Sequence, residues 1–109
     1  MTAKGVVLAR FEDVPDGGAI AVTINANTSI IIVRRGARLF AYENRCAHAD
    51  YPLQRADGHV SVQEGRYLVC AVHGASYAFE TGACAGGPCN RKGLKRVAIE
   101  VKNGEVRTA

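Results

Sequence analysis

Short runs of β-branched and apolar residues, separated by turn residues, dominate the chain and predict strands. Residues 6–10 form the first run, which the Pro and Gly residues of Asp13 to Gly18 end. Asn103-Gly104 predicts a tight hairpin between the last two strands. No amphipathic helix and no internal repeat is visible, so the pattern predicts an all-β chain. The remaining strands are expected over residues 19–24, 28–33, 38–43, 67–70, 76–80, 94–101 and 105–108.

The strand expected over residues 28–33 contains three consecutive isoleucines and hardly alternates. A continuous apolar run is typical of a strand covered on both faces, although another buried segment shows the same pattern. In the following strand, residues 38–43, the two aromatic side chains share one face, and Leu39 and Ala41 share the other.

The length of 109 residues and the 48% share of hydrophobic residues fit one folded domain. No apolar run approaches the ~20 residues that span a bilayer, and residues 1–5 lack the apolar stretch of a secretory signal. We therefore expect a soluble, cytoplasmic protein without a membrane partner. In that compartment the 4 cysteines are more readily explained by metal binding than by a disulfide framework.

The net charge of +4 is small for a nucleic-acid-binding protein, and the basic residues are scattered. We expect no nucleic-acid partner, and we interpret the basic residues as solvated turns and strand faces. A positive face that docks an acidic partner stays open as an alternative. The densest basic groups are Arg91, Lys92, Lys95 and Arg96, and Arg34, Arg35 and Arg38.

Two short cysteine–histidine pairs carry the candidate chemistry. One residue separates Cys46 from His48, and two residues separate Cys70 from His73. A thiolate and an imidazole this close on a turn can reach one metal centre, so two such loops supply two sulfur and two nitrogen ligands. This set suits a zinc ion, or a two-iron cluster with the cysteines on one iron and the histidines on the other.

The residues around these pairs resemble the Rieske family. Pro52-Leu53 lies downstream of the first pair, Gly74 follows the second, and a Gly-Pro loop is expected over Cys84 to Asn90. The segments Phe11 to Gly18 and Ala41 to Arg45 also resemble Rieske ferredoxins, so the resemblance runs over nearly the whole chain. Each pair alone is a weak signal, whereas both pairs in this order with these flanks form a specific one.

The resemblance implies a single Rieske domain over residues 1–109. Its β-sandwich or small-barrel base would comprise about residues 1–44 and 91–109, and the inserted cluster-binding subdomain about residues 45–90. It also implies one [2Fe–2S] cluster per chain, with the thiolates on the inner iron and the imidazoles on the outer iron near the surface. The implied ligands are Cys46, His48, Cys70 and His73.

By resemblance, the chain is a soluble one-electron carrier between a flavin-dependent NAD(P)H reductase and the terminal oxygenase of a ring-hydroxylating system. It has no substrate-pocket motif, no mononuclear iron triad and no room for a catalytic domain, so we expect no complete active site. Three alternatives stay open: a small subunit of a reductase complex of the nitrite-reductase type, a redox-sensing regulatory protein, and a structural zinc module.

Several family features that raise the reduction potential are absent. High-potential members carry a disulfide whose positions are occupied here by Tyr51 and by Ala71 or Val72, so that bridge cannot form. The serine expected two residues after the second histidine is Ala75, and Ser76 is displaced by one. Fewer hydrogen bonds to the cluster sulfurs imply a lower potential.

Other residues near the predicted cluster have two interpretations each. Tyr77 matches a family tyrosine that bonds to the cluster, and equally suits a core position. Cys84 and Cys89 bracket the Gly-Pro loop, and two partly buried thiols are favoured over a disulfide or redox-active pair and over a role as metal ligands. His59 is expected at the surface. It lies in the polar segment 54–66, which either shapes partner choice or forms a solvated hairpin.

Overall fold

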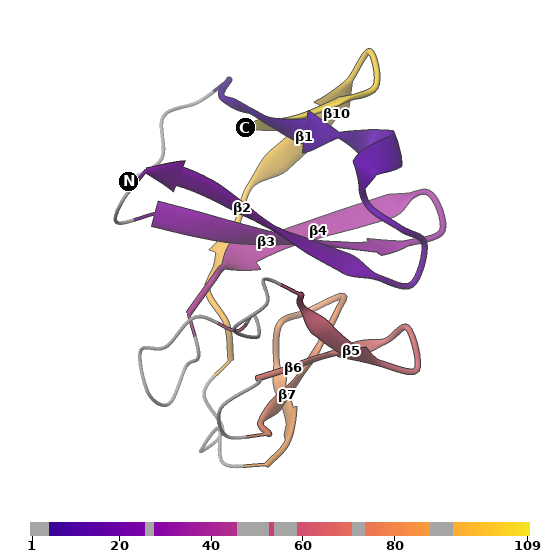
Figure 1. Cartoon of the computed structure of the whole chain (residues 1–109), viewed down its shortest axis with the longest axis vertical. Helices are drawn as coiled ribbons and strands as arrows, with labels where there is room; N and C mark the ends of the chain where they lie inside the picture. The colour runs from indigo at the N-terminus through magenta and orange to yellow at the C-terminus, as the bar shows by residue number, and fades with distance from the viewer. Residues whose placement is uncertain (1–4, 26–27, 46–52, 54–58, 71–73, 88–92) are drawn as a thin grey trace.

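The computed structural model describes residues 5–25, 28–45, 53, 59–70, 74–87 and 93–109 (Figure 1). Within these ranges every regular element is a strand, apart from one short 3-10 helix after the first strand. No helix of the described chain is long and apolar enough to cross a membrane. The predicted all-β fold class is confirmed. The elements are β1 (Val7–Arg10), η1 (Phe11–Asp13), β2 (Ala19–Asn25), β3 (Thr28–Arg35), β4 (Arg38–Glu43), β5 (Ser61–Gln63), β6 (Tyr67–Val69), β7 (Ser76–Ala78), β8 (Cys84–Gly86), β9 (Arg96–Val97), β10 (Ile99–Lys102) and β11 (Glu105–Thr108).

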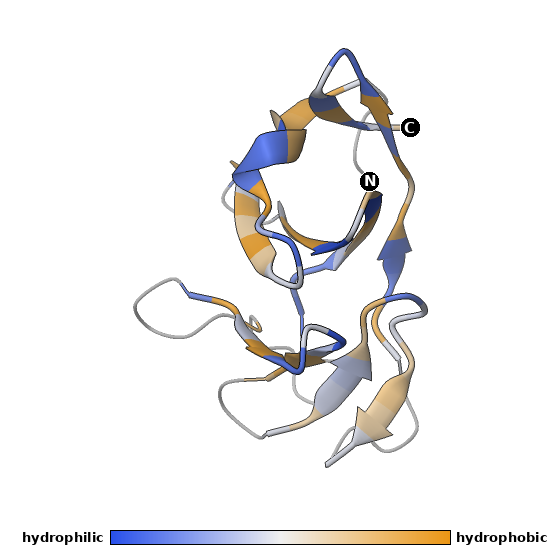
Figure 2. Cartoon of the chain, turned by 90° about the vertical axis from the view of Figure 1, so that its right-hand side faces the viewer, coloured by the Kyte–Doolittle hydropathy of each residue, from blue (hydrophilic) through white to orange (hydrophobic). Residues whose placement is uncertain are grey.

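The strands form three antiparallel sheets. The first sheet has the order β1-β11-β10, the second β2-β3-β4-β9 and the third β5-β6-β7-β8. Figure 2 shows the first two sheets curving around one interior, with the third sheet below them. The third sheet uses one continuous stretch of chain, whereas the other two combine strands from both ends of the sequence.

Strand β3 separates two hydrophobic cores. The base core, between the first two sheets, contains Ile30 and Ile32, and the interface core, next to the third sheet, contains Ile31 and Val33. All four side chains are at most 1% exposed, so the strand is covered on both faces as its pattern predicts. The base core is Leu8, Val14, Ile30, Ile32, Ala41 and Val106. The interface core is Ile31, Val33, Phe40, Tyr42, Leu53, Leu68, Cys70, Ala75, Tyr77, Phe79 and Leu94.

The predicted faces of β4 are also confirmed. Phe40 and Tyr42 belong to the interface core, whereas Ala41 belongs to the base core and Leu39 packs against it. Because successive side chains of a strand point to opposite faces, the alternation of this short segment assigns each residue to one core.

The second and third sheets are in direct contact at Gly82. A Cβ atom on this residue would lie 2.6 Å from Cε1 of Tyr42, so the aromatic ring occupies the space that any side chain would need. The backbone N–H of Leu94, on the way to β9, donates a hydrogen bond of 2.8 Å to the Gly82 carbonyl oxygen. The positive φ of 73° at Gly82 is a further reason for glycine here.

Charged residues add a second contact between these sheets. Arg35 and Arg38, at the β3–β4 hairpin, both approach the carboxylate of Glu80, at 3.1 and 3.9 Å. The three side chains are between 40% and 67% exposed. Two of the three arginines in the basic group Arg34, Arg35 and Arg38 are therefore paired with an acidic residue of the same chain. Solvent screens the attraction because the side chains are exposed.

Two strand predictions are wrong at the C-terminal half. The expected single strand 94–101 is divided at Ala98, because β9 pairs with β4 of the second sheet and β10 pairs with β11 of the first. The expected Gly-Pro loop after residue 83 begins as strand β8, which pairs with β7. The hydrophobic pattern predicts neither the division at Ala98 nor strand β8, because both depend on backbone hydrogen bonds to partner strands.

The polar segment 54–66 includes strand β5, which the sequence did not predict. β5 pairs with β6 across the turn at Glu64 and Gly65, so its second half is a hairpin. Gly65 lies against the base, since a Cβ there would be 3.4 Å from Cα of Gly17. Residues 61–69 therefore form a hairpin whose turn lies against Gly17, while a role of the segment in partner choice stays a prediction.

Candidate metal centre

Cys70 is the predicted ligand that lies within the described residues; Cys46, His48 and His73 lie outside them. The Cys70 side chain is 1% exposed, belongs to the interface core and is not disulfide-bonded. Within the described ranges, no three His, Cys, Asp or Glu side chains gather in one place. The four-residue ligand set therefore stays a prediction.

Cys70 begins a turn whose two ends are joined by hydrogen bonds. Its backbone N–H donates to the carbonyl oxygen of Ala75 at 2.7 Å, and its own carbonyl oxygen accepts from the N–H of Gly74 at 2.9 Å. Gly74 has a φ of 73°, which a residue without a Cβ adopts most readily. These bonds continue the β6–β7 ladder by one residue pair and hold the Cys70 backbone at the entrance to the turn.

The end of β8 packs directly on this turn. A Cβ on Gly87 would lie 2.8 Å from the Gly74 carbonyl oxygen and 2.9 Å from Cα of Ala75. Such distances are shorter than any ordinary carbon contact, and Gly87 also has a φ of 75°. Glycine is therefore required here by both space and conformation. Gly87, which lies within the predicted Gly-Pro loop, is thus packed against the second ligand turn.

Asn44 connects the two sides of the first predicted ligand segment. Its Oδ1 atom accepts a hydrogen bond of 2.7 Å from the backbone N–H of Leu53. Its Nδ2 atom donates to Oγ of Ser29 at 3.0 Å, and its backbone N–H donates to the Ser29 carbonyl oxygen at 2.9 Å. Asn44, two residues before Cys46, is thereby bonded to Leu53, five residues after His48, and to Ser29 on β3. This role of Asn44 was not predicted from the sequence.

The described surroundings of Cys70 suit an iron–sulfur cluster. Leu53 and Cys70 belong to the same core, so the end of the first segment and the start of the second meet there. Among the described residues no charged side chain is buried, and the residues of the interface core exclude water from the thiol. A buried cysteine in apolar surroundings fits the ligand of an inner iron. The described part of the site therefore fits the predicted group.

The structure confirms some of the predictions for the other residues near the predicted cluster and contradicts one of them. Ala75 and Tyr77 are fully buried in the interface core, so the core role of Tyr77 is confirmed. A hydrogen bond from Tyr77 to the cluster stays a prediction. Cys84 is disulfide-bonded, and its partner lies outside the described residues, so the favoured interpretation of two thiols is wrong for Cys84. His59 is exposed, as expected.

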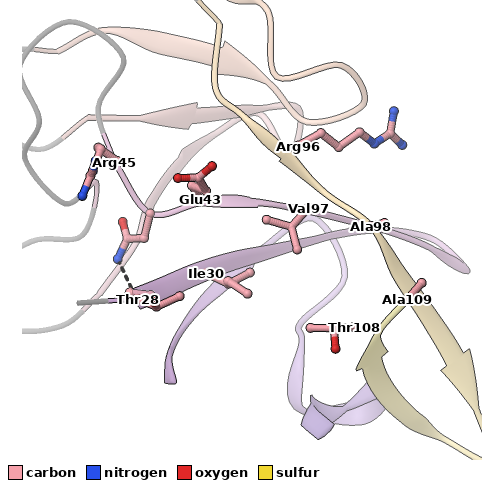
Figure 3. Close-up of a pocket in the computed structure, with 11 residues that line it drawn as sticks. Thr28, Ile30, Glu43, Arg45, Arg96, Val97, Ala98, Thr108 and Ala109 are labelled. Atoms are coloured by element: carbon pink, nitrogen blue, oxygen red, sulfur yellow. Dashed lines mark hydrogen bonds between the residues drawn. The ribbon is translucent and has the colours of Figure 1, made fainter. Parts of the chain in front are cut away.

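A cavity of about 510 Å³ lies on the base side of Asn44. Figure 3 shows Glu43 and Arg45 on one side of it and Ala98, Thr108 and Ala109 on the other, with the Asn44–Ser29 hydrogen bond dashed. None of its described lining residues is a cysteine or a histidine. The cavity therefore adjoins the Asn44 hydrogen bonds and is separate from Cys70.

Comparison with known proteins agrees with the resemblance drawn from the sequence. The chain is 26% identical over 103 residues to the ferredoxin component of the naphthalene 1,2-dioxygenase/salicylate 5-hydroxylase systems of Ralstonia sp., covering 94% of this chain and 92% of that protein. A chain in the complex of reduced oxygenase and oxidized ferredoxin of carbazole 1,9a-dioxygenase is 25% identical, with a TM-score of 0.82 and coverages of 99% and 94%. The Sphingomonas yanoikuyae B1 ferredoxin is 26% identical, with a TM-score of 0.77 and coverages of 95% and 96%.

The family model of the Rieske [2Fe-2S] domain matches residues 4–106, which is nearly the whole chain. The predicted Rieske fold and the predicted Rieske [2Fe–2S] cofactor are confirmed by this match. The buried Cys70, the glycine-dependent turn after it and the antiparallel sheets agree with it. This chain belongs to the Rieske [2Fe-2S] domain family.

Proposed function

We propose that this chain is a one-electron carrier, the ferredoxin component of a multicomponent dioxygenase system. The observation that carries the proposal is the near-complete overlap with ferredoxin components: the alignment covers 94% of this chain and 92% of the Ralstonia relative. The Ralstonia relative is a ferredoxin component, so this chain would deliver electrons, while the oxidation of the organic substrate takes place on a partner. It is therefore an electron-transfer component without a complete active site.

For the cluster, the proposed ligands are Cys46 and Cys70 on one iron and His48 and His73 on the other. The cluster supplies reversible one-electron chemistry when bound. The chain itself supplies a buried thiol at Cys70, a turn fixed by two backbone hydrogen bonds, and an apolar core that keeps water away. Because the imidazoles are neutral where thiolates are charged, this ligand set raises the potential above that of an all-cysteine cluster.

We further propose two subdomains within the single domain. The base would comprise about residues 1–44 and 91–109, and the cluster-binding subdomain about residues 45–90. The first two sheets use strands between residues 7 and 43 and between 96 and 108, whereas the third sheet uses strands between 61 and 86. This distribution supports the division.

The proposed partners are a terminal oxygenase and a flavin-dependent NAD(P)H reductase, both bound transiently. The structural relative from the carbazole 1,9a-dioxygenase complex supports the oxygenase, because that complex contains oxygenase and ferredoxin. The reductase follows from the family resemblance. A cytoplasmic location, where NAD(P)H is available, stays a prediction of the same proposal.

Electron transfer to an oxygenase tests the function. The purified protein is reduced without oxygen by NADH and catalytic amounts of a ferredoxin reductase, and is then mixed with an oxidised terminal oxygenase of the carbazole or naphthalene type. We expect its absorbance to return as the oxygenase is reduced, and we expect product formation to require the protein. Cys70→Ser, which removes a proposed ligand, should abolish both signals. A protein that exchanges no electrons with either partner and co-purifies with a large enzyme subunit would contradict the carrier function.

A further inference from the structure

Asn44 lies where β4 ends and the first predicted ligand segment begins. It is 9% exposed, and its side chain is hydrogen-bonded on two opposite sides. Oδ1 accepts from the N–H of Leu53 at 2.7 Å. Nδ2 donates to Oγ of Ser29 at 3.0 Å, which is the dashed bond in Figure 3. One amide therefore joins the start of a segment, its end, and a strand of the base.

Among the described residues, no backbone carbonyl group accepts a hydrogen bond from the N–H of Leu53 in place of Asn44. A buried N–H must have an acceptor, and Leu53 is fully buried. Oδ1 of Asn44 supplies that acceptor across nine positions, so a side chain, rather than a strand ladder, fixes the place where the segment re-enters the interface core. The second predicted segment is closed differently, by the backbone bonds between Cys70, Gly74 and Ala75.

The amide group is chemically specific for this task. It provides an acceptor for Leu53 and a donor for Ser29 at the same time, and it carries no charge. A carboxylate could still accept from Leu53, but it would bring a negative charge to within two residues of Cys46. An alanine would leave the Leu53 N–H without its acceptor. Comparing Asn44→Asp with Asn44→Ala therefore distinguishes the effect of the lost hydrogen bond to Leu53 from the effect of an added negative charge.

We propose that Asn44 is a positioning residue for the cluster: its amide closes the first ligand segment onto the interface core and thereby controls cluster retention. The proposal rests on the proposed function, because it requires Cys46 and His48 to be ligands. Hydrogen-bonding partners outside the ligand shell commonly change metal affinity by about 10–100-fold. Asn44 acts in this way through the backbone of Leu53 rather than by touching the metal.

The test compares Asn44→Ala, Asn44→Asp and Ser29→Ala in the cluster-loaded protein. Iron release to a chelator is followed by absorbance, the reduction potential by voltammetry, and backbone exchange at Leu53 by hydrogen–deuterium exchange. Asn44→Ala should release iron about 10-fold faster or more, and should lose protection at Leu53. Ser29→Ala, the matched control, keeps the bond to Leu53 and should stay near the wild-type rate.

Asn44→Asp should keep slow iron release, because a carboxylate oxygen still accepts from Leu53 and the Ser29 hydroxyl group can donate to it. Its potential should be lower than that of the wild type, because a nearby negative charge disfavours the added electron. If Asn44→Ala does not fold, iron release from Asn44→Asp still tests whether the bond to Leu53 controls cluster retention. Rapid iron release from Asn44→Asp with an intact Leu53 bond would contradict the proposal.

Two other outcomes would overturn it. One is an Asn44→Ala protein that is folded and releases iron at the wild-type rate. The other is equal acceleration by Ser29→Ala and Asn44→Ala, which would assign the effect to the bond with β3. Failure of the proposed ligand set is distinguishable, because the wild-type protein would then contain no iron at all, whereas failure of the carrier function alone would leave the iron-release comparison unchanged.

Discussion

The hydroxyl group of Tyr42 on β4 donates a hydrogen bond of 2.5 Å to the carbonyl oxygen of Phe79, just beyond β7. Both residues are buried in the interface core, so this bond joins the second sheet to the third where water is excluded. A buried acceptor without a partner is costly, and this bond therefore contributes to the attachment of the third sheet.

The substitution Tyr42→Phe should reduce the free energy of unfolding by about 1–3 kcal/mol, because it removes the donor to a buried carbonyl group and keeps the aromatic ring. Urea unfolding followed by far-UV circular dichroism measures the change. Tyr67→Phe is the control, because Tyr67 on β6 is partly exposed. Equal effects of the two substitutions would show that the Tyr42 bond contributes nothing beyond the loss of a hydroxyl group.

Tyr42 also predicts a loss of stability at alkaline pH. Burial raises the pKa of Tyr42 above its ordinary value, with Arg96 opposing the shift and Glu80 adding to it. The unfolded chain therefore loses this proton first, near pH 10, while the folded protein retains it. The free energy of unfolding should decrease as pH rises above about 10, and the decrease should be smaller in Tyr42→Phe. Urea midpoints of both proteins between pH 8 and 11 test this; parallel curves would contradict it.

Gly87→Ala should weaken cluster binding. The new methyl group would lie 2.8 Å from the Gly74 carbonyl oxygen, so the turn that follows Cys70 must move. Gly36→Ala is a matched control, because Gly36 has a similar positive φ of 65° and nothing within 4 Å of the added Cβ. The control should cost about 1–2 kcal/mol from conformation alone.

For Gly87→Ala we expect about 1–3 kcal/mol beyond this conformational cost, together with a lower iron content per chain. Thermal unfolding and iron analysis of both variants measure the two effects. If Gly36→Ala lost as much iron as Gly87→Ala, general destabilisation rather than displacement of the ligand turn would be the cause.

Glu80→Gln should change stability little. The carboxylate of Glu80 accepts from Arg35 at 3.1 Å, but the two side chains are 40% and 44% exposed. Exposed ion pairs contribute about 0–1 kcal/mol, and salt screens them. Urea midpoints at low and high salt should converge for the wild type and the variant. A loss well above this range, unchanged by salt, would show a tighter coupling between the sheets.

Strands β3 and β4 could be predicted because a continuous apolar run is typical of a strand covered on both faces, and alternation is typical of a strand between two cores. The uninterrupted apolar run of β3 places Ile30 and Ile32 in one core and Ile31 and Val33 in the other. The alternation in β4 assigns its aromatic residues in the same way. The hairpin at Asn103-Gly104 was predictable because both residues adopt a positive φ, of 53° and 77°.

Other features depend on pairing that a pattern does not contain. β5 is polar and gains its regularity from hydrogen bonds to β6, and the division at Ala98 depends on which sheet each half joins. Asn44 was missed because an asparagine at the end of a strand is ordinary turn chemistry. Its role becomes visible with its partners Ser29 and Leu53, which are distant in sequence.

The iron and acid-labile sulfide content of the freshly purified protein, with its visible spectrum, tests the central claim most directly. We expect about two iron ions and two sulfides per chain, and a red-brown colour that bleaches on one-electron reduction. A folded, colourless protein with about one zinc ion per chain would contradict it and indicate a structural metal site.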